Sequence, residues 1–82
     1  MTSSINLHVL LFGATADAVG SRKLVLATVE TTAQSLIDQL SKHHPALANH
    51  KLLIAVNEEY ADADTILSDG DEIALFTAVS GG

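Results

Sequence analysis

The last five residues of the sequence are the part best suited to chemistry. With average glycine usage of roughly 7%, two glycines end a chain by chance in about 0.5% of cases. Five extended residues span up to roughly 17 Å, and glycine has no side chain to block a narrow channel. We therefore expect this segment to carry the Gly82 carboxylate to a distant site. Its residues are Ala78, Val79, Ser80, Gly81 and Gly82.

A carboxylate becomes a good electrophile only when one of its oxygens is turned into a leaving group. The expected reaction is adenylation of Gly82 by an ATP-dependent partner, followed by attack of a nucleophile. The sequence contains neither Gly-x-x-x-x-Gly-Lys nor Gly-x-Gly-x-x-Gly, so we expect this chain to bind no cofactor and the partner to bind ATP. The chain is then a substrate and carrier, not a catalyst.

Other kinds of site have less support. The chain has no cysteine and four scattered histidines, and no His-x-x-x-His pair, so we expect no metal site and no Ser-His-Asp centre. His43 and His44 fit the end of a helix, where positive charge is favoured. Seven of the ten acids lie between Glu58 and Glu72, which indicates either solvated turns, the reading we favour, or a docking surface for a basic partner.

Composition narrows the class of protein further. The chain has 82 residues, 48% of them hydrophobic, and a formal net charge of −6. This size and balance predict one small folded domain, and the sign of the charge argues against nucleic acid as a partner. No apolar run approaches the roughly 18 residues of a membrane span and no signal peptide is evident, so we expect no membrane association and a cytoplasmic location.

Several elements must position the chain end. Alternation over residues 5 to 12 predicts a strand, residues 14 to 19 a short helical turn before Gly20, and residues 22 to 30 a returning strand. A capping box at Thr31 and Gln34 starts a helix that Pro45 ends near His43. The helix packs through one apolar stripe, formed by Ala33, Leu36, Ile37 and Leu40.

Two short apolar runs complete the set. Residues 52 to 57 and 73 to 76 predict central strands buried on both faces. Tight reversals are expected at Asn57-Glu58-Glu59-Tyr60 and at Ser68-Asp69-Gly70-Asp71. Strand, strand, helix, strand, small elements and strand make an α+β fold in which a mixed sheet carries one main helix on one side. We place the domain at residues 1–77 and a flexible tail at residues 78–82.

Four segments together resemble a known family. They are Leu10-Leu11-Phe12-Gly13, Val56-Asn57, residues 67 to 73 with the sequence LSDGDEI, and the closing Val79-Ser80-Gly81-Gly82. The set resembles the small subunits of molybdopterin synthase over nearly the whole chain. The resemblance implies a ubiquitin-like β-grasp fold.

The resemblance also implies a function in molybdenum cofactor biosynthesis. Gly82 would be adenylated by an activating enzyme, converted to a thiocarboxylate, and inserted into the synthase large subunit, which carries the catalytic residues. Sulfur would pass to cyclic pyranopterin monophosphate. The chain would thus be a non-catalytic, sulfur-donating subunit of a transferase, with a heterotetramer as the expected assembly.

Three positions that dock partners in this family align with Phe12, Tyr60 and Phe76, which are all the aromatic residues of the chain. Alternation puts Phe12 on the face opposite Ile5, and Tyr60 falls in a turn, so neither is required by the core. Aromatic side chains are favoured anchors at interfaces. Ordinary packing remains the alternative, most of all for Phe76.

The sequence departs from the family at two places. An Arg-Glu pair usual after the first strand is replaced by Ala16-Asp17, and two prolines often found before the tail are replaced by Thr77-Ala78. The first change argues against the family's ion pair with a partner at this place. The second leaves a less stiff tail, since proline fixes φ.

Three other functions are alternatives. The chain could carry sulfur for another pathway such as thiamine synthesis, or be a ubiquitin-like modifier joined to lysines. It could also be a plain interaction module whose final glycines are accidental. Lysine-linked adducts distinguish the modifier, and truncation of residues 81 and 82 without loss of function distinguishes the module.

Overall fold

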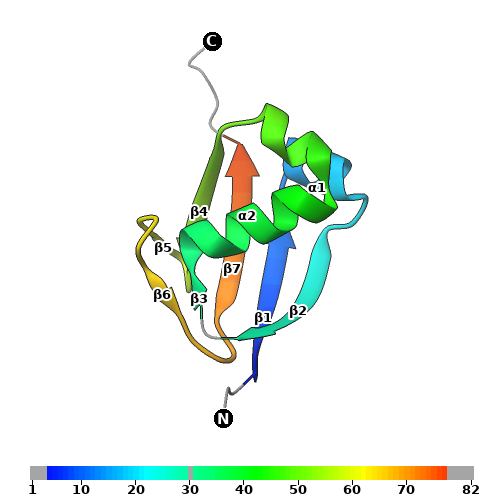
Figure 1. The fold of residues 1–82 in the computed structure, drawn as a ribbon. Helices are drawn as coiled ribbons and strands as arrows, with labels where there is room; N and C mark the ends of the chain where they lie inside the picture. The colour runs from blue at the N-terminus through cyan, green and yellow to red at the C-terminus, as the bar shows by residue number, and fades with distance from the viewer. Residues whose placement is uncertain (1–3, 30, 78–82) are drawn as a thin grey trace.

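A computed structural model describes residues 4–29 and 31–77 of the chain. This part of the chain forms two α-helices, one 3-10 helix and seven strands, and Figure 1 shows their arrangement. The elements are β1 (Ser4–Leu11), α1 (Ala14–Val19), β2 (Lys23–Val29), β3 (Thr31–Thr32), α2 (Ala33–His43), η1 (Pro45–Asn49), β4 (Leu52–Val56), β5 (Glu59–Tyr60), β6 (Ile66–Leu67) and β7 (Glu72–Thr77).

The main sheet has the strand order β2-β1-β7-β4-β5. β1 and β7 run parallel at its centre, while the β1–β2, β7–β4 and β4–β5 pairs are antiparallel. β3 and β6 form a separate two-stranded ladder. A mixed sheet with one main helix laid across it is the β-grasp arrangement, so the predicted fold class is confirmed.

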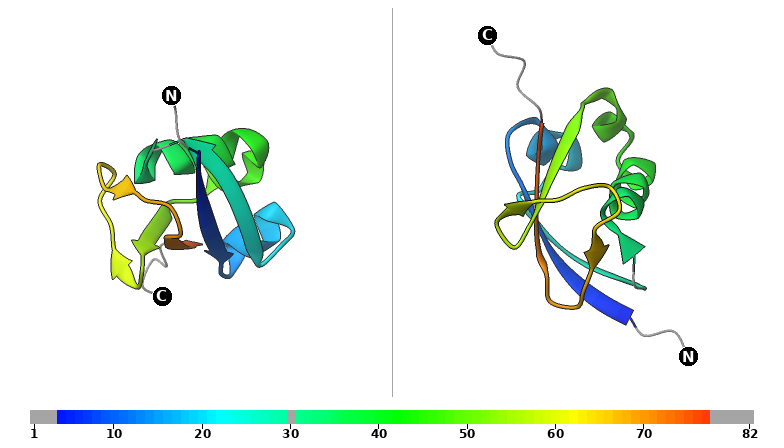
Figure 2. Two further views of the ribbon diagram at one scale, coloured as in Figure 1. Left: turned by 90° about the horizontal axis from the view of Figure 1, so that it is seen from below. Right: turned by 90° about the vertical axis from the view of Figure 1, so that its left-hand side faces the viewer.

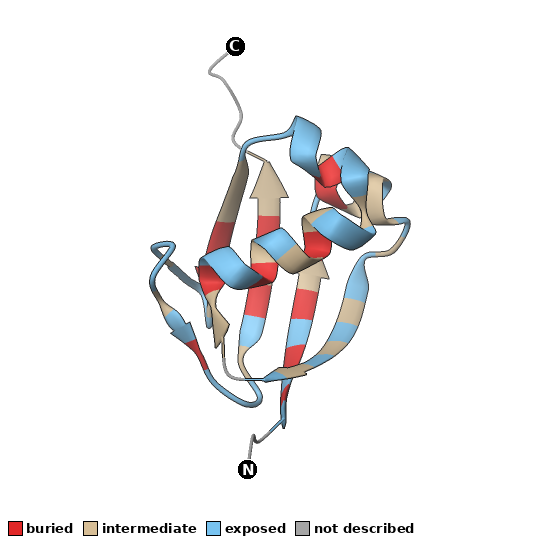
Figure 3. Cartoon of the chain, in the orientation of Figure 1, coloured by how far each residue is buried: buried red, intermediate tan, exposed pale blue. Residues whose placement is uncertain are grey.

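Helix α2 covers only one face of this sheet, as the edge-on view in Figure 2 shows. Period-two alternation turns one side of each strand toward the helix, and Figure 3 shows the buried segments of β1 and β7 lying behind α2. The core is formed by Ile5, Leu7, Val9, Leu11, Ala33, Leu36, Leu40, Leu47, Ile54, Leu67, Ile73 and Leu75.

The prediction that β4 and β7 are buried on both faces was wrong. Leu53, Ala74 and Phe76 point to the face that α2 does not cover, and they are only partly buried. Their apolar character therefore has a reason other than the core, because a sheet face that meets only water usually alternates with polar residues.

The start of α2 also differs from the predicted capping box. Thr32, not Thr31, is the N-cap, and its side-chain oxygen accepts a hydrogen bond from the Ser35 backbone N–H at 3.3 Å. Thr31 pairs with Leu67 in the β3–β6 ladder, and the Gln34 side chain donates to Asp38 at 2.9 Å. Strand pairing before the helix thus moves the cap by one residue.

The predicted turns are confirmed in place, but the placing of Glu59 and Tyr60 in a turn was wrong, because both pair with β4 as strand β5. Gly20 ends α1 in the left-handed conformation at φ 84°, and Gly70 has φ 84° in the turn before β7. The two-residue loop between β4 and β5 has positive φ at both Asn57 (51°) and Glu58 (72°). The turns at Asn57-Glu58 and at Gly70 set the registers in which β5 and β7 pair with the two opposite edges of β4.

Candidate functional site

The sheet face that α2 leaves uncovered carries all the aromatic side chains of the chain. Leu53 pairs with Phe76, and Ala55 pairs with both Ala74 and Tyr60, so these residues share one face across β4, β5 and β7. Leu10 pairs with Ala74 and extends the same face onto β1. We call this surface the open face and define it by Leu10, Phe12, Leu53, Ala55, Tyr60, Ala74 and Phe76.

Two of the three aromatic residues are largely exposed on the open face. Tyr60 retains 77% of its accessible surface and Phe12 retains 51%. Phe76 is half-buried, and its ring meets that of Tyr60 edge-on, with the centroids 5.7 Å apart. Edge-on contact is a favourable geometry for aromatic pairs, so Phe76 helps to hold Tyr60 in place while both remain accessible to a partner.

Phe12 is held by the junction between β1 and α1. Its backbone N–H donates to the Leu75 carbonyl at 3.1 Å and to the Thr15 hydroxyl at 2.9 Å. The Thr15 hydroxyl lies 2.6 Å from the Phe12 carbonyl and 3.0 Å from the Leu75 carbonyl, either of which can accept its proton. Thr15 is fully buried, so this contact ties the Phe12 backbone to the end of β7.

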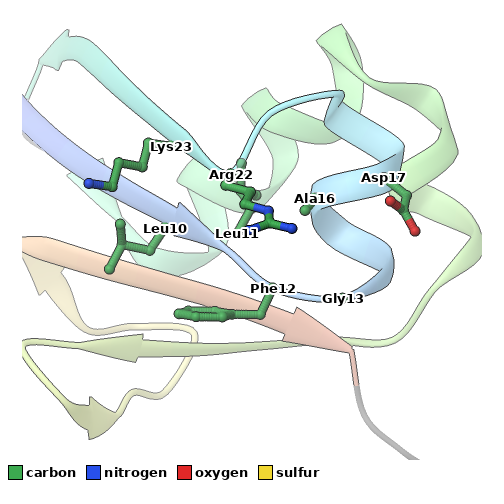
Figure 4. Close-up of a pocket in the computed structure, with 8 residues that line it drawn as sticks. All are labelled: Leu10, Leu11, Phe12, Gly13, Ala16, Asp17, Arg22 and Lys23. Carbon is green, nitrogen blue, oxygen red and sulfur yellow. The ribbon is translucent and has the colours of Figure 1, made fainter.

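A groove opens beside Phe12, where β1 leads into α1 (Figure 4). Its volume is about 540 Å³, and its lining residues are Leu10, Leu11, Phe12, Gly13, Ala16, Asp17, Arg22 and Lys23. Leu10 and Phe12 belong to the open face, so the groove continues that surface past the edge formed by β1 and β2. Ala16, which stands where the family usually has the arginine of an Arg-Glu pair, lines this groove together with Arg22.

The acidic stretch includes two carboxylates with structural roles. Asp71 accepts hydrogen bonds from the Asn57 side chain at 3.0 Å and from the Ser68 N–H at 2.8 Å. Asp69 accepts from the Asn6 N–H at 2.7 Å. The remaining acids of this stretch are exposed on turns and short strands, which agrees with the reading as solvated turns.

The predicted reactive segment begins directly after β7. β7 ends at Thr77, beside the end of β1. The predicted tail residues Ala78, Val79, Ser80, Gly81 and Gly82 lie outside the described residues. Gly82 is therefore not placed, but Thr77, from which the chain continues toward it, lies at the same end of the sheet as Phe12 and Phe76.

Sequence reasoning found the aromatic part of this surface and missed its aliphatic part. Leu10, Leu53 and Ala74 complete the open face, and Arg22 and Lys23 line its adjoining groove. Alternation along β1 could have placed Leu10 with Phe12, since both have the parity opposite to the core residues. No pattern in the sequence indicated that Arg22 and Lys23 belong to this surface, because only the fold brings them beside Phe12.

Among residues 4–29 and 31–77, no group of three or more His, Asp or Glu side chains is arranged to hold a metal ion. Within the same ranges no helix is long and apolar enough to cross a membrane.

A family model and a relative of known name agree on the family to which this chain belongs. The model of the ThiS family matches residues 9–82. A molybdopterin synthase sulfur carrier subunit from Mycobacterium tuberculosis is 38% identical over 82 aligned positions, which cover 95% of this chain and 99% of the relative.

Solved structures agree with this fold. The crystal structure of small archaeal modifier protein 1 from Haloferax volcanii has a TM-score of 0.80 and 27% identity, covering 92% of this chain and 99% of that one. A chain in the complex of subunits 1 and 2 of molybdopterin-converting factor from Helicobacter pylori has a TM-score of 0.64 and 22% identity, covering 95% of this chain and 100% of that one.

Proposed function

The chain belongs to the ThiS family, and on this basis we propose that it is the sulfur carrier subunit of a molybdopterin synthase. The observation that carries the proposal is the full-length match to a relative of that name, which spans 99% of the relative at 38% identity. The structure adds a surface suited to the role: an apolar face with exposed aromatic side chains next to the strand end that leads to Gly82.

The proposed reaction takes place at the Gly82 carboxyl group. A carboxylate oxygen attacks the α-phosphorus of ATP in the activating enzyme, and pyrophosphate leaves. A sulfur nucleophile then displaces AMP to give the thiocarboxylate. In the synthase this sulfur forms a bond to a carbon of cyclic pyranopterin monophosphate, water attacks the Gly82 carbonyl carbon, and its C–S bond breaks, so that Gly82 returns to a carboxylate. This chain binds no cofactor of its own in the scheme, and ATP belongs to the activating enzyme.

The proposed partner in the synthase is a large subunit, in a heterotetramer, docked on the open face. Immobilising five tail residues costs roughly 1 to 2 kcal/mol for each residue. Apolar contacts at Phe12, Tyr60 and Phe76 offset this cost, because buried aromatic anchors contribute much of the free energy of association. One surface can serve both enzymes in turn, since the two encounters do not occur together.

The test is direct chemical loading of the full chain. The chain is incubated with activating enzyme, ATP and a sulfur donor, and its intact mass is measured. We expect the gain that corresponds to one oxygen replaced by sulfur. The matched control lacks Gly82 and should show no gain; an unchanged mass of the complete chain would contradict the proposal.

A second function is favoured by one observation, the likeness to small archaeal modifier protein 1 at a TM-score of 0.80. A modifier uses the same adenylated glycine but is joined to lysine amines. Lysine-linked adducts that persist under denaturing conditions would support this second function. Stable association with the large subunit supports the first and also separates it from a thiamine-type sulfur carrier.

A further inference from the structure

The groove next to Phe12 combines apolar walls with the most concentrated positive charge of the chain. The sequence has four Lys and Arg residues in all, and two of them, Arg22 and Lys23, line this groove. Both are exposed, in the turn before β2 and at its first residue. In Figure 4 the Arg22 guanidinium extends toward Ala16, while the Asp17 carboxylate turns outward from α1.

The rest of the molecule makes this local charge unusual. Seven acids lie from Glu58 to Glu72, in the β4–β5 loop, in β5, in the first residue of β7 and in the segments between β5 and β7. Lys23 pairs with Leu10 near the end of β1, whereas Glu72 lies level with His8, further back along the same strand. Positive charge therefore gathers at the end of the sheet where β7 leads to the tail, in a chain whose formal net charge is −6.

We propose that this groove receives an acidic side chain of the protein that docks on the open face. A guanidinium binds a carboxylate through two parallel hydrogen bonds, and an ammonium group adds a second, adaptable donor. Leu10 and Phe12 form walls against which the aliphatic part of an Asp or Glu residue, or an apolar neighbour, can pack.

Continuity with the open face identifies the kind of partner. Leu10 and Phe12 belong to both surfaces, so a protein seated on the aromatic residues reaches Arg22 without leaving the sheet edge. The ion pair between Arg22 and the partner's carboxylate then fixes the orientation of the chain as its tail end enters the partner, since complementary charges set register at interfaces. This proposal rests on the proposed function, because it takes the synthase large subunit as the docking protein.

The test compares two charge-neutralised variants in binding to the large subunit. Arg22→Gln with Lys23→Gln removes the two groove cations, and Lys42→Gln removes an exposed cation in the last turn of α2, outside the groove. We expect the groove variant to bind about tenfold more weakly or worse at low salt. Its affinity should also depend less on salt, because fewer charge pairs are screened. The Lys42 variant should bind within about twofold of the unaltered chain.

The outcomes separate this proposal from the function on which it rests. If the unaltered chain fails to bind the large subunit, the proposed function fails. If it binds and the groove variant binds equally well, or the Lys42 variant loses as much affinity, the groove proposal is overturned while the function stands. As a second arm, Arg22→Glu is tested against large-subunit variants in which one interface Asp or Glu is changed to Arg. Recovered binding in one of these variants identifies the carboxylate that enters the groove. If every interface Asp and Glu of the large subunit has been changed in turn and none of the changes restores binding, the proposal is overturned.

Discussion

Thr15 shows how a single side chain can support the proposed docking surface without touching a partner. It is the only fully buried polar residue among the described residues. Its hydroxyl joins the Phe12 backbone to the Leu75 carbonyl. This contact fixes both the residue that anchors the open face and the strand that leads to the tail. The hydroxyl accepts from the Phe12 N–H and donates to one of the two carbonyls, so its removal loses two hydrogen bonds, each worth about 0.5 to 1.5 kcal/mol.

We predict that Thr15→Val lowers the free energy of unfolding by about 1 to 3 kcal/mol, because it keeps the shape of the side chain and removes the hydroxyl. Thr15→Ser, which keeps the hydroxyl and removes a methyl group, is the matched control and should cost less. Urea denaturation of both variants measures the difference. A valine variant as stable as the serine variant would show that the hydrogen bonds contribute little.

For single residues, the sequence predicted those side-chain positions that depend on neighbouring residues along the chain. The outward position of Phe12 follows from the alternation of its strand and is confirmed by its 51% exposure. The role of Thr15 could not be predicted, because its partner Leu75 is 60 positions away. The same holds for Arg22, whose place in the groove depends on the return of β2 along β1.

The elements show where local rules compete with pairing. The apolar stripe of α2 predicted its buried face, with Ala33, Leu36 and Leu40 buried as expected. Its first residue was shifted, because Thr31 pairs with Leu67 and leaves Thr32 to cap the helix. Both threonines suit an N-cap, so only the β3–β6 ladder decides between them, and β6 lies more than thirty positions further along the chain.

The β4–β5 hairpin contains the clearest backbone strain. Asn57 tolerates positive φ, but Glu58 adopts φ 72° with a Cβ that is disfavoured there. We predict that Glu58→Gly raises the free energy of unfolding by about 1 kcal/mol, since an Asn-Gly loop suits a two-residue hairpin. Glu58→Ala is the control, because it removes the same charge and keeps the Cβ. Thermal and urea unfolding compare them, and an equal gain in both would assign the effect to charge.

On the scale of the whole molecule, one helix on a five-stranded sheet leaves one face without cover. The sequence predicted this layering, but it also predicted strands buried on both sides, and the two expectations conflict. The conflict is resolved by the open face, where apolar side chains of β4 and β7 stay partly exposed. Apolar residues that the core does not use are the signature of a surface that another protein covers.

The final prediction tests whether the open face, and not exposed apolar surface in general, is the docking site. Tyr60→Ser should lower affinity for the large subunit roughly thirtyfold, the effect of losing about 2 kcal/mol at an interface anchor. The control is Val29→Ser, because Val29 is 48% exposed but lies at the end of β2 that pairs with Ser4, far from Tyr60 and from the end of the sheet that leads to the tail.

Titration calorimetry with the large subunit measures both affinities, and urea unfolding confirms that each variant remains folded. The Val29 variant should bind like the unaltered chain, because its side chain lies on β2 beside Ser4, outside the residues that define the open face. The Tyr60 variant should lose at most about 1 kcal/mol of stability, since its edge-on contact with Phe76 is modest. Equal losses of affinity in the two variants, or none in either, would place the docking surface elsewhere on the molecule.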